Sequence, residues 1–167
     1  MELQAHPRYW PWRAPDWWAA VVSGLAAGAL LMVLDLCWPL MAGNGNPWAT
    51  SHQIAALLLG QQVLQSTGFE LGVVVTALLI HYSLGVFSGL VIGSAIAALR
   101  YESTLAMAPV LGVAFGFVIY WVNFYWMAPF FPWFAGLRGG ATFVGHIVFG
   151  LSAALIYCRL SRTAAAA

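Results

Sequence analysis

The chain has 167 residues, of which 62% are hydrophobic and only 7% are charged. A soluble domain carries about 25% charged residues, so this composition is typical of a membrane protein. The formal net charge is +1, which leaves no basic patch of the kind that binds nucleic acid. The length favours one domain and no linker-like stretch divides the sequence, so we predict a single transmembrane domain over residues 1–167.

The N-terminal segment carries Arg8 and Arg13 and leads directly into a long hydrophobic run. That run is too long for the apolar core of a signal peptide, and no clear small-residue cleavage site follows it. We therefore expect the first hydrophobic segment to be retained as a membrane span.

Four segments are long and apolar enough to cross a membrane, which takes about 20 residues. The predicted spans are residues 17–41, 71–99, 105–128 and 141–160. Between the first two spans, breaker-rich residues 42–48 precede an apolar stretch that is too short to span. Its glutamines alternate with apolar residues, so we predict a short helix over residues 51–65 that lies at the membrane interface. The predicted fold is an all-α, integral membrane four-helix bundle.

The arginines predict the orientation of the spans. Arg138 follows the third span, and the other five arginines flank the opposite ends of the spans: Arg8, Arg13, Arg100, Arg159 and Arg162. By the positive-inside rule, both termini lie in the cytoplasm and the loops over 43–70 and 130–140 lie outside. We expect Trp10, Trp12, Trp17 and Trp18 to form an inner aromatic belt, and Trp38, Trp48, Trp126 and Trp133 an outer one.

The two halves of the sequence share a pattern that suggests a duplicated two-helix hairpin. The first span reads Gly24-x3-Gly28-x6-Asp35-x2-Trp38, and the third reads Gly112-x3-Gly116-x6-Asn123-x2-Trp126, with identical spacing. A Pro-Trp pair follows each of these spans, and the next span then contains His-x3-Gly, at His81 and at His146. Both hairpins start on the same side, so the pattern predicts a parallel repeat about an axis along the membrane normal.

The polar residues of the repeat share helix faces with its glycines. Asp35 lies on the face of Gly24 and Gly28, and His81 begins a run of glycines spaced by four residues. Small-residue faces are where helices approach one another in lipid, so the polar residues are expected to face the bundle interior. At 1.5 Å per residue they fall about 20–28 Å from the cytoplasmic ends of their spans, and the predicted intramembrane cluster is Asp35, His81, Asn123 and His146.

This predicted cluster has several interpretations, because intramembrane Asp and His are costly and mark functional sites by default. The structural interpretation is that Asp35 bonds a histidine or Asn123 and locks the hairpins together. A second is a proton or ion relay through Asp35, His81 and His146. A third makes His81 and His146 axial ligands of a b-type haem. A metal site has no supporting HxxxH or CxxC spacing, and none is predicted.

Three residues of the outer loops, His52, Glu70 and Arg138, are weaker candidates that would cover the cluster. Solvated loop positions explain them equally well. The two cysteines, Cys37 and Cys158, fall near opposite ends of their spans and are not expected to form a disulfide. No nucleophile elbow, Walker loop, dinucleotide fingerprint or CxxCH is present, so the sequence predicts no enzyme.

Short motifs across most of the chain resemble a family of small four-span bacterial inner-membrane proteins of unknown function. The similarity is carried by NPW at 46–48, IAALLLG at 54–60, VNFY at 122–125, FPWF at 131–134, Arg138 and His146-x2-Phe149-Gly150. The resemblance implies a bacterial inner membrane and supplies no activity.

Two function classes remain open. The favoured one is a non-catalytic accessory or structural subunit of a larger bacterial membrane complex, for example a respiratory complex. Its expected partners are the lipid bilayer and other membrane subunits or further copies of itself. The alternative is a small oligomeric transporter or channel that uses the Asp and His residues. Haem ligation by His81 and His146 is the third alternative.

Overall fold

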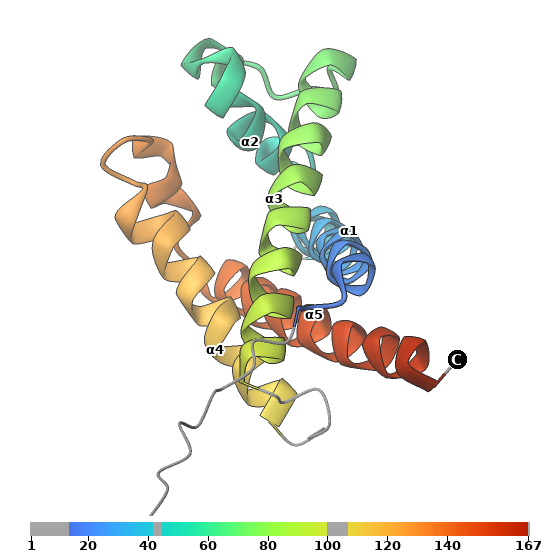
Figure 1. Ribbon diagram of the computed structural model, residues 1–167. Coiled ribbons are helices and arrows are strands. Elements are labelled where there is room, and N and C mark those ends of the chain that lie inside the picture. Colours follow the sequence, from blue (N-terminus) through green and yellow to red (C-terminus); the bar gives the residue numbers. More distant parts are fainter. Residues whose placement is uncertain (1–13, 42–44, 100–106, 167) are drawn as a thin grey trace, which may run out of the picture.

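The computed structural model describes residues 14–41, 45–99 and 107–166, and within these ranges the chain is helical with no strand. Its long helices are α1 (Trp17–Met41), α3 (Leu71–Ala98), α4 (Met107–Trp121) and α5 (Gly140–Ala166). A five-residue π-helical turn, η3 (Val122–Trp126), continues α4. Figure 1 shows how these helices cross. The four predicted spans are confirmed as helices long and apolar enough to cross a membrane.

The segment between α1 and α3 differs in part from the prediction of one helix over 51–65. It forms α2 (Ala49–Leu59) and a short 3-10 helix, η1 (Gln61–Gln65). The break falls at Gly60, whose φ of 87° lies in the left-handed region that glycine tolerates. A second short 3-10 helix, η4 (Pro132–Leu137), precedes α5.

Helices α1 and α3 pack backbone to backbone through their glycines. A methyl group on Gly24 would collide with the carbonyl oxygen of Gly85, and one on Gly89 would collide with the carbonyl oxygen of Ala20. Only glycine permits such an approach, which maximises van der Waals contact between two helices in lipid.

Helices α4 and α5 pack in the same manner. A methyl group on Gly112 would lie 2.7 Å from the carbonyl oxygen of Gly150. One on Gly116 would collide with the carbonyl oxygen of His146. The glycine faces predicted from the sequence are therefore used inside each hairpin.

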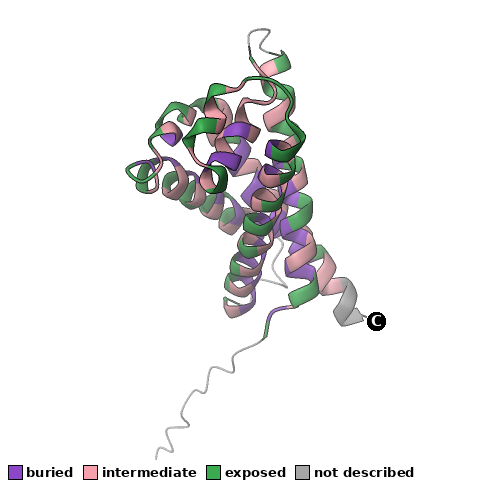
Figure 2. Cartoon of the chain, turned by 90° about the horizontal axis from the view of Figure 1, so that it is seen from above, coloured by how far each residue is buried: buried purple, intermediate pink, exposed green. Residues whose placement is uncertain are grey.

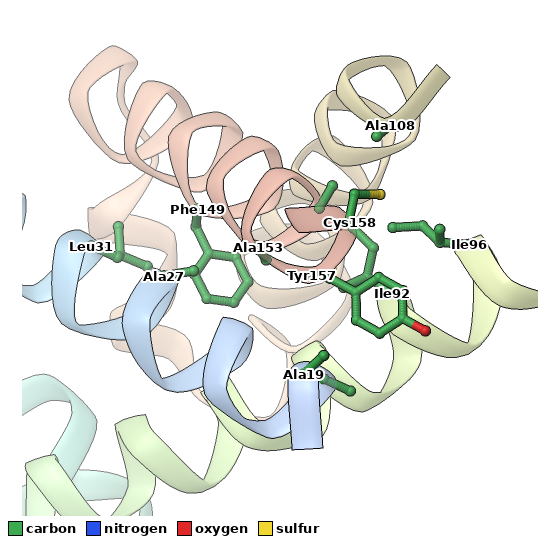
Figure 3. Close-up of a cluster of buried hydrophobic side chains, with 12 residues drawn as sticks. Ala19, Ala27, Leu31, Ile92, Ile96, Ala108, Phe149, Ala153, Tyr157 and Cys158 are labelled. Carbon is green, nitrogen blue, oxygen red and sulfur yellow. The ribbon is translucent and has the colours of Figure 1, made fainter. Parts of the chain in front are cut away.

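The two hairpins join mainly where α1 packs on α5. Figure 3 shows Phe149 and Ala153 of α5 beside Ala27 and Leu31 of α1, within the principal hydrophobic core. The start of α1 is also fixed here, because the Asp16 main-chain N–H donates to the Tyr157 hydroxyl (3.2 Å). The Asp16 carboxylate accepts from the N–H of Ala19 (2.9 Å), which makes Asp16 the N-cap of α1.

The opposite side of the bundle is much more open. α3 and α4 make few contacts, and Figure 1 shows them diverging toward the end that carries α2 and η4. Figure 2 shows buried residues in the interior and exposed residues over the outside. The exposed side chains are largely apolar, as expected of helices that face lipid.

Several sequence predictions concern residues outside the described ranges. Arg8, Arg13 and Arg100, which carry most of the orientation argument, are among them, as are Trp10 and Trp12. Of the predicted belt residues that are described, Trp17, Trp18, Trp38 and Trp126 are each more than half exposed. Cys37 is exposed and Cys158 is buried, and no disulfide joins the two.

Candidate functional site

Asp35 and His81 line the same cavity, which lies between α1, α2 and α3. The cavity has a volume of about 150 Å³ and is partly enclosed. Its polar lining comes from five side chains, namely Asp35, Trp48, Thr50, Ser51 and His81. The remainder is apolar and includes Met32, Leu36, Ile54, Val74 and Leu78. The sequence predicted that Asp35 lies within reach of His81, His146 or Asn123, and of these three residues His81 shares its cavity.

Asp35 is the one member of the predicted cluster with no bonded partner. Its side chain is half-buried, and among the described residues no donor forms a hydrogen bond or ion pair with its carboxylate. Asp35 therefore lines the cavity without a bonded partner. Hydrogen bonds between helices account for the other three members of the cluster, but they do not account for Asp35.

His81 joins α3 to α1 through a hydrogen bond to the main chain. Its Nε2 lies 2.8 Å from the carbonyl oxygen of Gly28. Because a carbonyl only accepts, Nε2 must carry the proton, which leaves Nδ1 as the acceptor in the neutral ring. The ring does not require glycine at position 28, since a methyl group there would lie in ordinary contact, 3.6 Å from Nε2.

His146 forms the corresponding link between α5 and α4 with the other tautomer. Its Nδ1–H donates to the carbonyl oxygen of Thr142 (2.8 Å), and its Nε2 lies 3.4 Å from the amide nitrogen of Asn123, which donates to it. The ring is 7% exposed and packs against the rings of Tyr120 and Phe124. Asn123 belongs to the π-helical turn η3, which sets its position relative to His146.

The predicted cluster therefore consists of two pairs, one in each hairpin. The cavity that holds Asp35 and His81 has neither Asn123 nor His146 in its wall. A relay that runs through all four side chains would need a connection between the pairs.

The two histidines do not fit a haem site as they stand. An axial ligand needs a free imidazole nitrogen. Here both nitrogens of His146 have partners, whereas His81 uses Nε2 for the Gly28 carbonyl and keeps only Nδ1 as an acceptor. The cavity beside His81 is of a size that holds a benzene-like molecule, far smaller than a porphyrin. Within the described ranges, no three His, Cys, Asp or Glu side chains are grouped in a way that would hold a metal ion.

Of the three loop candidates, His52 is buried, whereas Glu70 and Arg138 are exposed and make hydrogen bonds at the surface. His52 is 3% exposed, and its two ring nitrogens lie 2.7 and 2.8 Å from the carbonyl oxygens of Val63 and Gly68. It thereby fastens α2 to the segment that leads into α3. Glu70 accepts a hydrogen bond from the Ser66 hydroxyl.

Arg138 closes the end of α4. Its Nε–H donates to the carbonyl oxygen of Phe124 (2.7 Å), and its guanidinium lies 4.5 Å from the centroid of the Tyr125 ring. Both partners belong to η3, so Arg138 supports the turn that positions Asn123.

Trp48, Thr50 and Ser51 were not identified as site residues from the sequence. Trp48 was assigned to the aromatic belt, whereas its ring packs edge-to-face on Phe69 (5.0 Å between centroids) and lines the cavity. Trp133, assigned to the same belt, donates its indole N–H to the carbonyl oxygen of Gln53 and so connects η4 to α2. The only sequence signal that could have identified these three residues was their position at the start of α2.

Compared with models of protein families, with curated proteins and with solved structures, the chain finds no match.

Proposed function

We propose that the chain is a non-catalytic subunit of a larger membrane assembly in the bacterial inner membrane. The observation that carries the proposal is how the polar side chains of the spans and their ends are used. His81, His146 and Arg138 each donate to a main-chain carbonyl of a helix. The bonds of His81 and Arg138 join separate helical segments, that of His146 lies within α5, and none of these three donor groups is free to bind a substrate.

The proposal includes an origin by duplication of a two-helix hairpin. In its support, residues at equivalent positions make equivalent contacts. Gly24 packs on Gly85 as Gly112 packs on Gly150, and Gly28 contacts His81 as Gly116 contacts His146. Each of these pairs has the spacing expected if α1 corresponds to α4 and α3 to α5.

One face breaks this correspondence and is our proposed surface for partner subunits. Phe149 of α5 is 5% exposed because it packs on α1, whereas its equivalent on α3, Leu84, is 53% exposed. Two turns further toward the C-terminal ends of the same helices the correspondence returns, since Ile92 of α3 and its equivalent on α5, Tyr157, are both buried. Since α4 corresponds to α1, the face around Leu84 is the one expected on the open side toward α4, and it lacks the helix contact that its counterpart has.

We further propose that both termini are cytoplasmic, from the arginine distribution, and that α2 lies on the outer side. A reporter fused to the C-terminus that is active in the cytoplasm and silent in the periplasm is the expected result. Activity only in the periplasm would reverse the orientation.

A second function, a small oligomeric transporter or channel, is favoured by one observation, the shared cavity of Asp35 and His81. Against it, the corresponding position of the second hairpin is Asn123, which cannot carry a proton as a carboxylate does and is bonded to His146.

Purification under native conditions distinguishes the two functions. The chain is extracted from its own membrane in a mild detergent, and the associated chains are identified by mass spectrometry. We expect other membrane proteins in fixed stoichiometry. A homo-oligomer that conducts protons or ions in vesicles would overturn the subunit proposal.

A further inference from the structure

The cavity between α1, α2 and α3 holds a carboxylate that nothing in the described structure neutralises. Asp35 lies on a span, and its polar neighbours in the wall are Trp48, Thr50, Ser51 and His81. A charged carboxylate in a membrane span is costly unless it is paired, protonated or bound to a cation. No arginine belongs to this wall, and its one histidine, His81, directs Nε2 to the carbonyl oxygen of Gly28, so no side chain of the lining is bonded to the Asp35 carboxylate.

We propose that this cavity binds a small organic ammonium ion, with Asp35 as its counter-ion. This inference goes beyond the subunit function and does not rest on it. The ammonium group donates hydrogen bonds to the Asp35 carboxylate, and the alkyl part contacts the apolar wall.

The chemistry of the wall favours an organic cation over a metal ion. A hard cation such as Ca²⁺ takes six to eight oxygen ligands in an all-oxygen shell. Here the side-chain oxygens are those of Asp35, Thr50 and Ser51, and much of the remaining lining is hydrocarbon from residues such as Leu36, Ile54 and Leu78. A wall with one charge, a few polar groups and many apolar atoms is typical of a small-molecule site.

Trp48 supplies the second element of cation recognition. Its ring lines the cavity and is held by edge-to-face packing on Phe69, with an interplanar angle of 66°. The face of an indole attracts a cation that lies within about 6 Å of the ring centroid. A carboxylate and an indole on one wall recognise the positive charge of a ligand together.

The volume sets the size of the ligand. A cavity of about 150 Å³ accommodates a molecule comparable to benzene, with about six non-hydrogen atoms. Aliphatic amines of three to five carbons fall within this limit. Larger amines would require α2 to move away from α1 and α3.

The test compares two molecules of nearly equal size on the wild-type protein. Purified full-length chain in lipid nanodiscs is titrated with n-propylammonium chloride and, separately, with n-propanol, and heat of binding is measured. We expect saturable binding of propylammonium and binding of propanol that is weaker by about tenfold or more. Equal affinities for the two molecules, or no saturable binding of propylammonium, would overturn the proposal.

Two variants then assign the charge to Asp35. Asp35→Asn preserves the shape of the side chain and is expected to weaken propylammonium binding by about tenfold or more. Asp16→Asn removes the same charge at the start of α1, away from the cavity wall, and is expected to bind as the wild type does. Unchanged binding in Asp35→Asn, in protein that elutes as the wild type on gel filtration, would refute the role of Asp35. The comparison of the two probes on the wild type needs no variant and stays decisive if Asp35→Asn does not fold.

Discussion

His81 on α3 donates a hydrogen bond of 2.8 Å from Nε2 to the main-chain carbonyl oxygen of Gly28 on α1. This bond joins the two glycine-lined helices of the first hairpin. In the second hairpin, His146 bonds Asn123 and Thr142 instead. The two histidines occupy equivalent positions in the sequence and hold their helices through opposite tautomers.

Replacing His81 tests whether this bond stabilises the hairpin. His81→Ala removes the hydrogen-bond donor and enlarges the cavity that His81 lines. We expect the free energy of unfolding to fall by about 1 kcal/mol, the usual net value of one hydrogen bond. His81→Gln retains an N–H donor and is expected to lose less. Thermal unfolding of both variants in the same detergent measures the difference. Equal losses in the two variants would mean that the bond contributes nothing.

The glycines provide a matched set of alanine substitutions. Gly24→Ala places a methyl group against the carbonyl oxygen of Gly85, and helix backbones must separate to relieve it. We expect a loss of about 1–3 kcal/mol, as for overpacking elsewhere. Gly28→Ala meets only ordinary contact, with His81 Nε2 at 3.6 Å, and is expected to be tolerated.

In the second hairpin, the position equivalent to Gly28 does not tolerate a methyl group. A methyl group on Gly116 would collide with the carbonyl oxygen of His146, so Gly116→Ala is expected to be as damaging as Gly24→Ala. Thermal unfolding of the three variants gives the ranking. If Gly28→Ala proved more damaging than Gly116→Ala, the packing described for the two hairpins would be incorrect.

Arg138 offers a test of the π-helical turn. Arg138→Gln removes the charge that lies on the Tyr125 ring and weakens the bond to the carbonyl oxygen of Phe124. We expect η3 to exchange its amide hydrogens faster by about tenfold, which corresponds to about 1.4 kcal/mol, while α1 and α3 remain unchanged. Hydrogen exchange followed by mass spectrometry resolves these segments. Uniform acceleration over the whole chain would instead indicate global destabilisation.

Two substitutions of Asp35 distinguish a structural role of this residue from a role in proton movement. In a structural subunit, Asp35→Asn keeps a polar group in the cavity and is expected to leave assembly with partners intact. Asp35→Leu removes both oxygens of the Asp35 side chain and places hydrocarbon beside Thr50 and Ser51 in the cavity. It is therefore expected to reduce the yield of assembled protein. Quantifying co-purified partners for both variants tests this. A severe loss in Asp35→Asn with normal folding would favour the transporter alternative.

The sequence predicted the spans well and their contacts only in part. Apolar length is a local property, and it located the four long helices within a few residues at most ends. The glycine spacing likewise indicated which faces approach. By contrast, the break at Gly60 and the π-helical turn at Val122–Trp126 depend on backbone angles that apolar periodicity does not report.

The sequence identified the residues of the candidate site, but it did not predict which of them lie next to one another. Asp35, His81, Asn123 and His146 were identified because polar groups are rare in spans, but depth along a helix does not say which neighbour each one meets. Their division into two pairs follows from the packing of α1 with α3 and of α4 with α5. Trp48 was missed as a lining residue because its contact with the cavity depends on how α2 folds back over the spans.

The face around Leu84 allows the most direct test of the subunit proposal. A photo-crosslinking amino acid is introduced at Leu84, which is 53% exposed on the open side, and separately at Leu79, which is 65% exposed and lines a surface groove on another face of α3. Both variants are irradiated in native membranes, and cross-linked products are identified by mass spectrometry. The subunit proposal predicts a discrete product with a different membrane protein from position 84 and none from position 79. Products that contain only further copies of this chain, or no protein product from position 84, would contradict it.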